Sequence, residues 1–172
     1  MQPIHDEEGR VNQVLVNSTD IHDLKTTQQE LQDLNRTLEE RVEQRTAEVQ
    51  DLYDNAPAGY HSLDPNGCII LVNETELKWM GYTREEMIGQ PIQKFFTPAS
   101  LNIFRENFPA FKQRGWLKDL ELEYIRKNGT ILPALINATA IHDEHGNFIL
   151  SRSTVMDNTE HKAVDEALRN AN

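Results

Sequence analysis

The sequence predicts an α+β protein, because three kinds of segment follow one another along its 172 residues. A long polar stretch with apolar residues at alternating spacings of three and four predicts one extended helix over residues 21–54. Two short β-type runs then precede a series of helices, and three longer β-type runs come after them. Strands, helices and strands in this order are typical of an antiparallel sheet with its helices gathered on one side.

Residues 1–20 repeat a pattern that is found near the end of the chain. Residues 4–9 read IHDEEG and residues 141–146 read IHDEHG, and at the same offset Asp20 corresponds to Asp157. Both copies combine a charged turn, a β-type run and an Asp that begins a helix, which indicates a repeated unit. We therefore expect residues 1–20 to be the remaining last strand of a preceding unit. The alternative is a lone strand that caps the sheet.

The helix over residues 21–54 is expected to form a parallel coiled coil, with residues 21–52 joining two copies into a homodimer. Most a and d positions of a heptad pattern are apolar, and neither Pro nor Gly interrupts it. The predicted dimer seam comprises Leu24, Leu31, Asn35, Leu38, Val42 and Val49. Asn35 falls at an a position, where a polar residue lowers stability but fixes the register of a parallel dimer. The alternative is a single solvated helix.

Residues 60–72 predict a β-hairpin, since the central DPNG sequence combines a proline with an Asn-Gly pair that accepts positive φ angles. Two short helices follow it, and each begins with a residue pair typical of a capping box. These pairs are Asn73 with Glu76 and Thr83 with Glu86. Gly81 and Gly89 are placed to end the two helices.

A longer helix is predicted over residues 98–114, with its apolar residues on one face. That face comprises Leu101, Phe104, Phe108 and Phe111. Pro109 lies inside the pattern and is expected to kink or end the helix near Phe108.

Three β-type runs complete the predicted sheet, over residues 120–124, 132–140 and 148–156. In the first run apolar residues alternate with glutamates, which indicates one buried and one wet face. In the second run Leu132, Ala134, Ile136, Ala138 and Ala140 share one face. The three alanines leave room for helix packing or for a small ligand. Residues 158–172 are expected to form an exit helix that Asp157 caps.

The run NETELKWMGYTREEMIGQP at residues 73–91, the KNGT turn at 127–130 and the Asp-Asn-Thr ending at 157–159 closely resemble the PAS domain family. The likeness is to PAS domains of bacterial, histidine-kinase-type sensors in two-component signalling. It implies a PAS fold over residues 55–157, a five-stranded antiparallel sheet with short helices on one face. The run LEERVEQRTAEV at residues 38–49 similarly resembles the linker helices that join such sensors to kinase cores.

The resemblance also implies a ligand pocket between the helix at 98–114 and the sheet. The candidate pocket residues are His61, Phe96, Leu101, Phe104, Phe108, Leu135 and Ala138. In similar domains the signal leaves the sheet at the Asp-x-Thr ending, which corresponds here to Asp157 and Thr159. We expect a dimer that relays a change caused by a ligand or partner to a downstream kinase or other effector. The alternatives are a ligand-free dimerisation scaffold and a fragment of a larger sensor histidine kinase.

Composition and missing motifs exclude several other functions. The net charge of −11 argues against nucleic-acid binding. No apolar run approaches 18 residues, and the charged first residues do not form a signal peptide, so we expect a cytoplasmic protein without membrane insertion. The sequence contains no phosphate loop, nucleophile elbow, metal-binding His pair or kinase core, and we therefore expect no enzymatic activity.

The sequence leaves the cofactor unknown but argues against two groups. The helix at 98–114 contains no His that could serve as the axial ligand of a haem. Residues 91–96 read PIQKFF where the light-sensing subfamily carries its Asn-Cys-Arg-Phe motif, which disfavours covalent flavin chemistry. Cys68, the single cysteine, is expected to be a small buried apolar residue.

Overall fold

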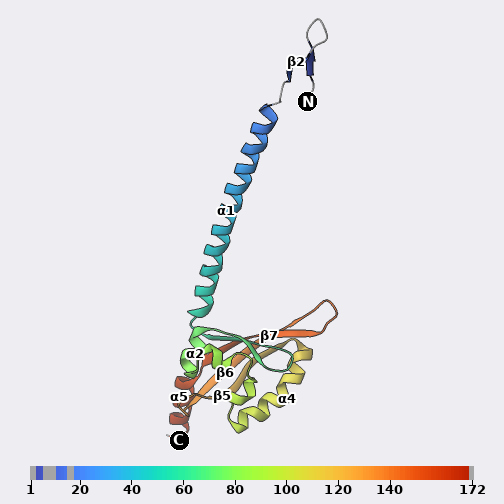
Figure 1. Ribbon diagram of the computed structural model, residues 1–172. Coiled ribbons are helices and arrows are strands. Elements are labelled where there is room, and N and C mark those ends of the chain that lie inside the picture. The colour runs from blue at the N-terminus through green and yellow to red at the C-terminus, as the bar shows by residue number, and fades with distance from the viewer. Residues whose placement is uncertain (1–2, 6–10, 15–17, 171–172) are drawn as a thin grey trace. The chain divides into compact units, whose positions relative to one another are not determined.

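The computed structural model describes residues 3–5, 11–14 and 18–170 (Figure 1). The chain divides into two compact units, Met1–Val49 and Gln50–Asn172. Within the described residues, the first unit contains strands β1 (Pro3–His5) and β2 (Val11–Val14) and most of helix α1 (Ser18–Asp54). The two strands pair antiparallel. The charged turn expected between them falls on residues 6–10, outside the described residues.

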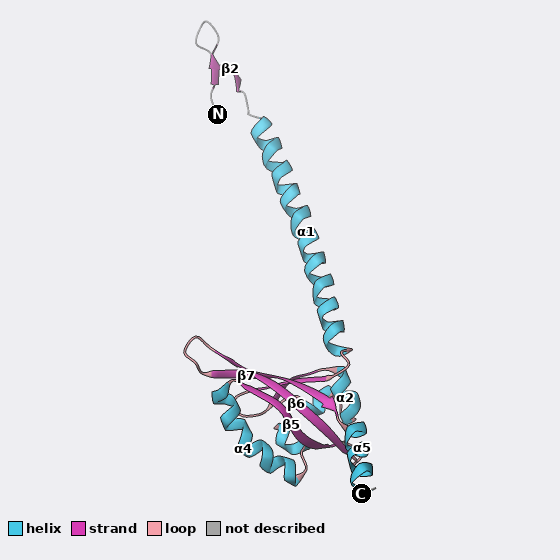
Figure 2. Ribbon diagram, turned by 180° about the vertical axis from the view of Figure 1, so that it is seen from behind, coloured by secondary structure: helices cyan, strands magenta, loops and turns pink. Residues whose placement is uncertain are grey.

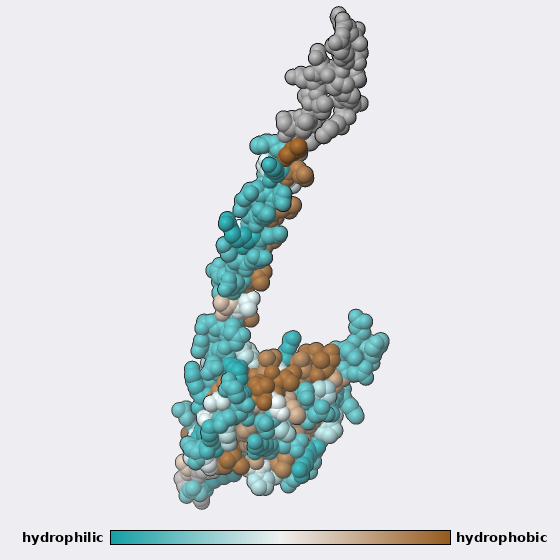
Figure 3. All heavy atoms as spheres, viewed as in Figure 1, coloured by the Kyte–Doolittle hydropathy of each residue, from teal (hydrophilic) through white to brown (hydrophobic). Residues whose placement is uncertain are grey.

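Helix α1 runs without a break over the segment that the heptad pattern predicts. Every side chain from residue 21 to residue 52 is exposed. Figure 3 shows apolar atoms along one side of this helix. Its exposed apolar side chains include Leu24, Leu31, Leu38, Val42 and Val49. The single chain therefore buries none of the predicted seam.

The second unit is built on one five-stranded antiparallel sheet, which confirms the predicted α+β fold. The strand order is β4-β3-β7-β6-β5. The strands are β3 (Gly59–Leu63), β4 (Ile69–Val72), β5 (Trp116–Ile125), β6 (Ile131–His142) and β7 (Phe148–Asp157). The chain crosses from the β4 edge to the β5 edge through α2 (Glu74–Met80), α3 (Arg84–Met87), the 3₁₀ helix η1 (Ile92–Phe95) and α4 (Pro98–Arg114). Helix α5 (Thr159–Asn170) follows the last strand.

The core lies between this group of helices and one face of the sheet, and Figure 2 shows α4 along that side. Strand β6 presents the face predicted from its alternation, since Leu132, Ala134 and Ile136 are all buried. From α4, Phe104 and Phe111 are buried against the same core. The sheet therefore has one side packed on helices and one side turned away from them.

The ends of the short helices follow the predicted chemistry at most positions. Asn73 accepts a hydrogen bond from the Glu76 backbone N at 3.1 Å, and Gly81 ends α2 with φ 76°. At α3 the capping box is complete, with the Glu86 carboxylate accepting from the Thr83 backbone N at 2.9 Å. These caps fix where two helices that are too short to persist alone begin and end.

Pro109 does not end α4, which continues to Arg114. The prediction that the helix could stop near Phe108 is therefore wrong. Proline removes one backbone hydrogen bond and costs a helix interior about 3 kcal/mol. Packing of the α4 phenylalanines on the sheet offsets this cost, because burying each such side chain contributes roughly 1.5–3 kcal/mol.

No helix in the described part of the chain combines the length and the apolar character that crossing a membrane requires.

Candidate functional site

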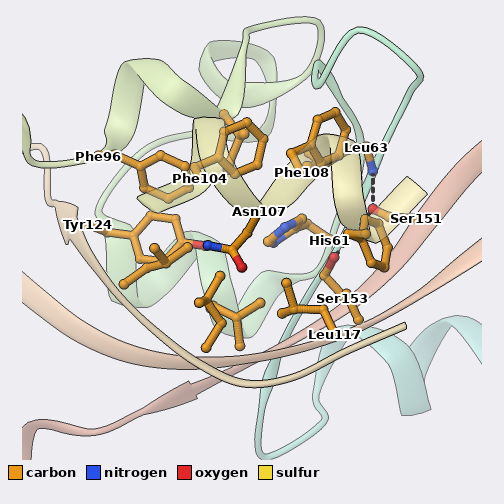
Figure 4. Close-up of a pocket in the computed structure, with 16 residues that line it drawn as sticks. His61, Leu63, Phe96, Phe104, Asn107, Phe108, Leu117, Tyr124, Ser151 and Ser153 are labelled. Atoms are coloured by element: carbon orange, nitrogen blue, oxygen red, sulfur yellow. Dashed lines mark hydrogen bonds between the residues drawn. The ribbon is translucent and has the colours of Figure 1, made fainter. Parts of the chain in front are cut away.

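A cavity of about 40 Å³ lies between α4 and the inner face of the sheet (Figure 4). Its wall is mostly aromatic and aliphatic. The aromatic members are Phe96, Phe104, Phe108, Phe111 and Tyr124, and the aliphatic members are Leu63, Ile92, Leu117, Leu120, Leu122, Ile136 and Ala138. The polar members are His61, Asn107, Ser151 and Ser153. The site is thus a largely apolar space with one polar side, as small-molecule sites commonly are.

The aromatic wall is a connected set of rings. The ring centroid of Phe96 lies 5.4 Å from that of Phe104 and 5.0 Å from that of Tyr124, and the rings of Phe104 and Phe108 stack at 4.8 Å. Such pairs add about 0.5–1.5 kcal/mol each beyond their buried area. Burial raises the pKa of Tyr124 well above its ordinary value, with a further contribution from the charge of Glu76, so its phenol remains neutral.

The polar side is centred on a buried pair formed by His61 of β3 and Glu76 of α2. The His61 Nδ1 atom lies 2.9 Å and 3.1 Å from the two carboxylate oxygens of Glu76. The side chains are only 3% and 1% exposed. An ionised carboxylate only accepts hydrogen bonds, so Nδ1 is the donor and Nε2 is the atom left for the cavity.

Two serines and an amide complete the polar side. Ser151 accepts a hydrogen bond from the Leu63 backbone N at 3.0 Å, and its hydroxyl lies 3.3 Å from that of Ser153. Asn107 donates from Nδ2 to the Ile103 carbonyl at 2.8 Å, which leaves its Oδ1 atom available. Figure 4 shows the Asn107 amide extending from α4 into the space beside His61.

The pair of His61 and Glu76 corrects one prediction from the sequence. Glu76 was expected to complete a capping box by accepting from the Asn73 backbone N. That N–H donates instead to the Tyr60 carbonyl at 2.9 Å, and the Glu76 carboxylate bonds His61. The capping pattern is a local signal, whereas the true partner lies on the preceding strand.

Most of the predicted pocket residues line the cavity, namely His61, Phe96, Phe104, Phe108 and Ala138. Leu101 and Leu135 are not part of its wall. Leu101 packs against the core nearer the start of α4. Leu135 lies between the buried Ala134 and Ile136, and side chains alternate across a strand, so it belongs to the opposite face.

The sequence did not single out Asn107, Ser151 or Ser153. The two serines carry a weak signal, because they lie two residues apart on β7 and Val155 continues their face. Asn107 carries no such signal, because a polar residue beside the apolar face of a helix ordinarily lies at the edge of that face.

Asn73 connects the site to the end of α1, and all of its side-chain polar groups are used. Its Oδ1 also accepts from the Tyr60 backbone N at 2.9 Å. Its Nδ2 donates to the carbonyls of Tyr53 at 2.8 Å and Ala58 at 3.0 Å. The residue is fully buried. One side chain therefore ties together the last turn of α1, strand β3 and the start of α2.

Ion pairs strengthen this connection. Arg84 contacts the carboxylates of Asp54 at 3.2 Å and Glu74 at 2.8 Å, and it donates to the Val72 carbonyl. Desolvation opposes ionisation of Asp54, but hydrogen bonds from Gln50, the Glu74 backbone and Arg84 hold its pKa below the ordinary value. Burial, followed by the charge of Glu76, raises the pKa of Tyr53 to about 12. We call Tyr53, Asp54, Asn73 and Arg84 the helix joint.

The predicted relay residues lie where β7 meets α5. Asp157 accepts a hydrogen bond from the Thr159 backbone N at 2.9 Å and a second one from the Thr159 hydroxyl. The Asn158 backbone N donates to the Pro133 carbonyl at 2.9 Å, and Lys162 lies 3.3 Å from Glu123. The first turn of α5 is thereby attached to β5 and to the start of β6.

This geometry agrees with the comparisons with known proteins. A family model described as PAS domain matches residues 57–160. The chain belongs to the PAS domain family. The phosphoserine phosphatase RsbP of Bacillus subtilis is 34% identical over 91 residues, which are 52% of this chain and 23% of that protein. The chain therefore matches less than a quarter of that relative's length.

Solved PAS domains share the fold. The PAS domain of an HTR-like protein from Haloarcula marismortui superposes with a TM-score of 0.62 at 22% identity, covering 71% of this chain and 98% of that one. A PAS domain from a two-component sensor histidine kinase gives 0.57 at 17% identity, covering 67% and 98%. At these identities the likeness extends to the fold alone.

The described residues of this PAS protein contain no group of three or more His, Cys, Asp or Glu side chains placed to hold a metal ion.

Proposed function

We propose that this chain is a PAS sensory module that transmits the state of its cavity to the flanking helices of a dimer. One observation carries the proposal: two residues at the start of α2, Asn73 and Glu76, bond the end of α1 and the polar wall of the cavity, and they are three positions apart. His61 faces the cavity and bonds Glu76, while Asn73 caps the same helix and bonds Tyr53. A shift of His61 would therefore move Glu76 and the first turn of α2, where the N-cap Asn73 bonds the last turn of α1.

The dimer is proposed to form through residues 21–52. The apolar seam residues are exposed in the single chain, with Leu24 at 69% and Val49 at 66%. Burying apolar surface contributes about 25 cal/mol per Å², so a helix of this length gains stability from a partner. An equivalent helix from a second copy presents the same heptad pattern.

The effector is proposed to be a separate catalytic module, because no catalytic motif is present in this chain. A phosphatase such as that named for RsbP and a kinase of a two-component sensor are both compatible with output through Asp157, Thr159 and α5. We place the dimer in the bacterial cytoplasm, as for the sensors that the sequence resembles.

A ligand-free dimerisation scaffold is the second candidate. The volume of the cavity favours it, because about 40 Å³ is far below the 300–1,000 Å³ of sites that hold drug-sized ligands. In this scaffold the helix joint would serve only to orient α1.

Native mass spectrometry of the freshly purified chain, compared with its denatured mass, separates these candidates. A dimer with extra mass that is lost on denaturation supports the sensor. A dimer at the bare polypeptide mass supports the scaffold, or a sensor whose weak ligand is lost in purification. A monomer at working concentration contradicts the dimer in both.

A further inference from the structure

The polar side of the cavity offers two hydrogen-bonding atoms that lack protein partners within the described residues. His61 is 4% exposed, and with its Nδ1 atom bonded to Glu76 its Nε2 atom has no protein partner. The Oδ1 atom of Asn107 likewise receives no hydrogen bond there, since only Nδ2 of that amide is engaged. Both side chains belong to the cavity wall, and Figure 4 shows them beside each other.

Charge restricts what these atoms bind. Glu76 lies behind His61 and is buried, and its carboxylate takes up the Nδ1 side of the ring, so Nε2 is the ring atom that meets a ligand in the cavity. The wall contains no Asp, Glu, Lys or Arg. Because His61 is already paired with Glu76, a charged ligand would lose its hydration without gaining an unpaired opposite charge. A neutral ligand does not carry this cost.

Size restricts the ligand further. One water molecule needs roughly 10–15 Å³ of cavity volume. The space of about 40 Å³ thus holds about three water-sized groups.

We infer that the cavity binds a small neutral molecule of about three or four non-hydrogen atoms that carries a hydroxyl or a primary amide. One of its polar atoms forms a hydrogen bond with His61 Nε2, and its N–H or O–H donates to Asn107 Oδ1. The apolar remainder lies against the aromatic wall. This inference rests on the proposed sensory function and gives its ligand a chemical class.

Acetamide and acetate test the inference as a matched pair, because they have the same shape and differ in charge. The readout is the ¹⁵N chemical shifts of the His61 ring in the full chain. Acetamide is expected to move the Nε2 signal in a saturable manner at millimolar concentration, as suits so small a ligand. Acetate is expected to bind at least about tenfold more weakly. Ala138→Leu, which fills the cavity, should abolish the acetamide response.

Equal binding of the two probes, or no saturable response to acetamide, overturns the ligand class. The proposed function is tested by separate outcomes. If the native dimer carries a larger ligand while acetamide does not bind, the sensory proposal stands and only the ligand class is lost. If neither experiment finds a ligand, the scaffold replaces both.

A second inference rests on an independent observation, the backbone register of β1 and β2. Their paired residues are Pro3 with Val14, Ile4 with Gln13 and His5 with Val11, with an irregularity between Ile4 and His5. At the tip of β6 and β7 the pairs are Ala140 with Ser151, Ile141 with Leu150 and His142 with Phe148, with an irregularity between Ile141 and His142. Each residue number in the second set exceeds that of its counterpart in the first set by the same amount, and the irregularity falls at the corresponding place.

From this shared register we propose that β1 and β2 are the final pair of strands of a preceding PAS unit. Helix α1 then leaves that unit as α5 leaves this one. An isolated two-stranded hairpin is marginally stable in water, so β1 and β2 fit a role as the end of a larger sheet. The partner of this hairpin is a sheet of the same kind as β3 to β7.

A graft within the full chain tests the equivalence. Residues 4–13 replace residues 141–150 in one variant, and residues 5–14 replace the same segment in the control. The first graft keeps Gly at position 146, where φ is 80°, and keeps each side chain on its face. It should unfold cooperatively, within roughly 10 °C of the original chain. The shifted graft should lose the cooperative transition. Equal behaviour of the two grafts overturns the proposal.

Discussion

At the scale of residues, an ionisable pair, His61 and Glu76, lies inside an apolar core. Breaking a buried pair by removing one partner costs about 3–5 kcal/mol, because the other charge is left uncompensated. Replacing both partners by apolar residues is often close to neutral. His61 and Glu76 meet the conditions for this asymmetry, since both are almost fully buried and bond each other at 2.9 Å.

His61→Leu is therefore predicted to lower the free energy of unfolding by about 3–5 kcal/mol. The double variant His61→Leu with Glu76→Leu should recover most of that loss, because no unpaired carboxylate remains. Urea denaturation of the single and double variants measures both values. A double variant at least as unstable as His61→Leu alone would contradict the pairing described here.

At this scale the sequence predicts the structure correctly where the chemistry is local. The capping role of Asn73 followed from its place before a helix, and the box at Thr83 and Glu86 is present as predicted. The role of Glu76 was missed because a pattern over three residues cannot report a partner fifteen positions earlier on a strand. The other bonds of Asn73 were missed for the same reason, since Tyr53 and Ala58 reach it only through the tertiary fold.

At the scale of elements, the long helix is where sequence and structure agree most directly. An unbroken polar segment with a heptad pattern forms the continuous helix α1, and its apolar side is exposed in the single chain. Predictions for α4 and β6 were less complete. The apolar face predicted for α4 is present, although Pro109 does not end the helix. Leu135 was included in the pocket although the alternation of β6 places it on the other face.

Asn35→Ile is predicted to strengthen self-association, since a polar residue at an a position lowers the stability of a coiled coil. It should also relax the stoichiometry, because that residue fixes register and favours dimers. Sedimentation equilibrium of the purified variant measures both effects. Glu40→Ile is the matched control, with the same gain in apolar surface at an outer heptad position. Equal association of the two variants would contradict the heptad assignment.

At the scale of the whole molecule, the fold was more predictable than the site. Turn residues, caps and strand alternation are local and mutually consistent, so they specify the order of elements and the buried face of the sheet. The cavity depends instead on which side chains meet between α4 and the sheet, and on their volumes. The largely aromatic wall leaves only about 40 Å³. Neither spacing nor composition determines such a volume, so the ligand class had to come from the packed structure.

A change in the cavity is expected to reach the helix joint, and amide hydrogen exchange in the full chain tests this directly. Ala138→Leu fills the cavity, and Leu135→Met changes a side chain on the opposite face of the same strand. The first variant should alter exchange at the amides of Tyr60 and Glu76 and in the last turn of α1, and the second should not. Changes confined to the cavity wall, or the same changes in both variants, would contradict it.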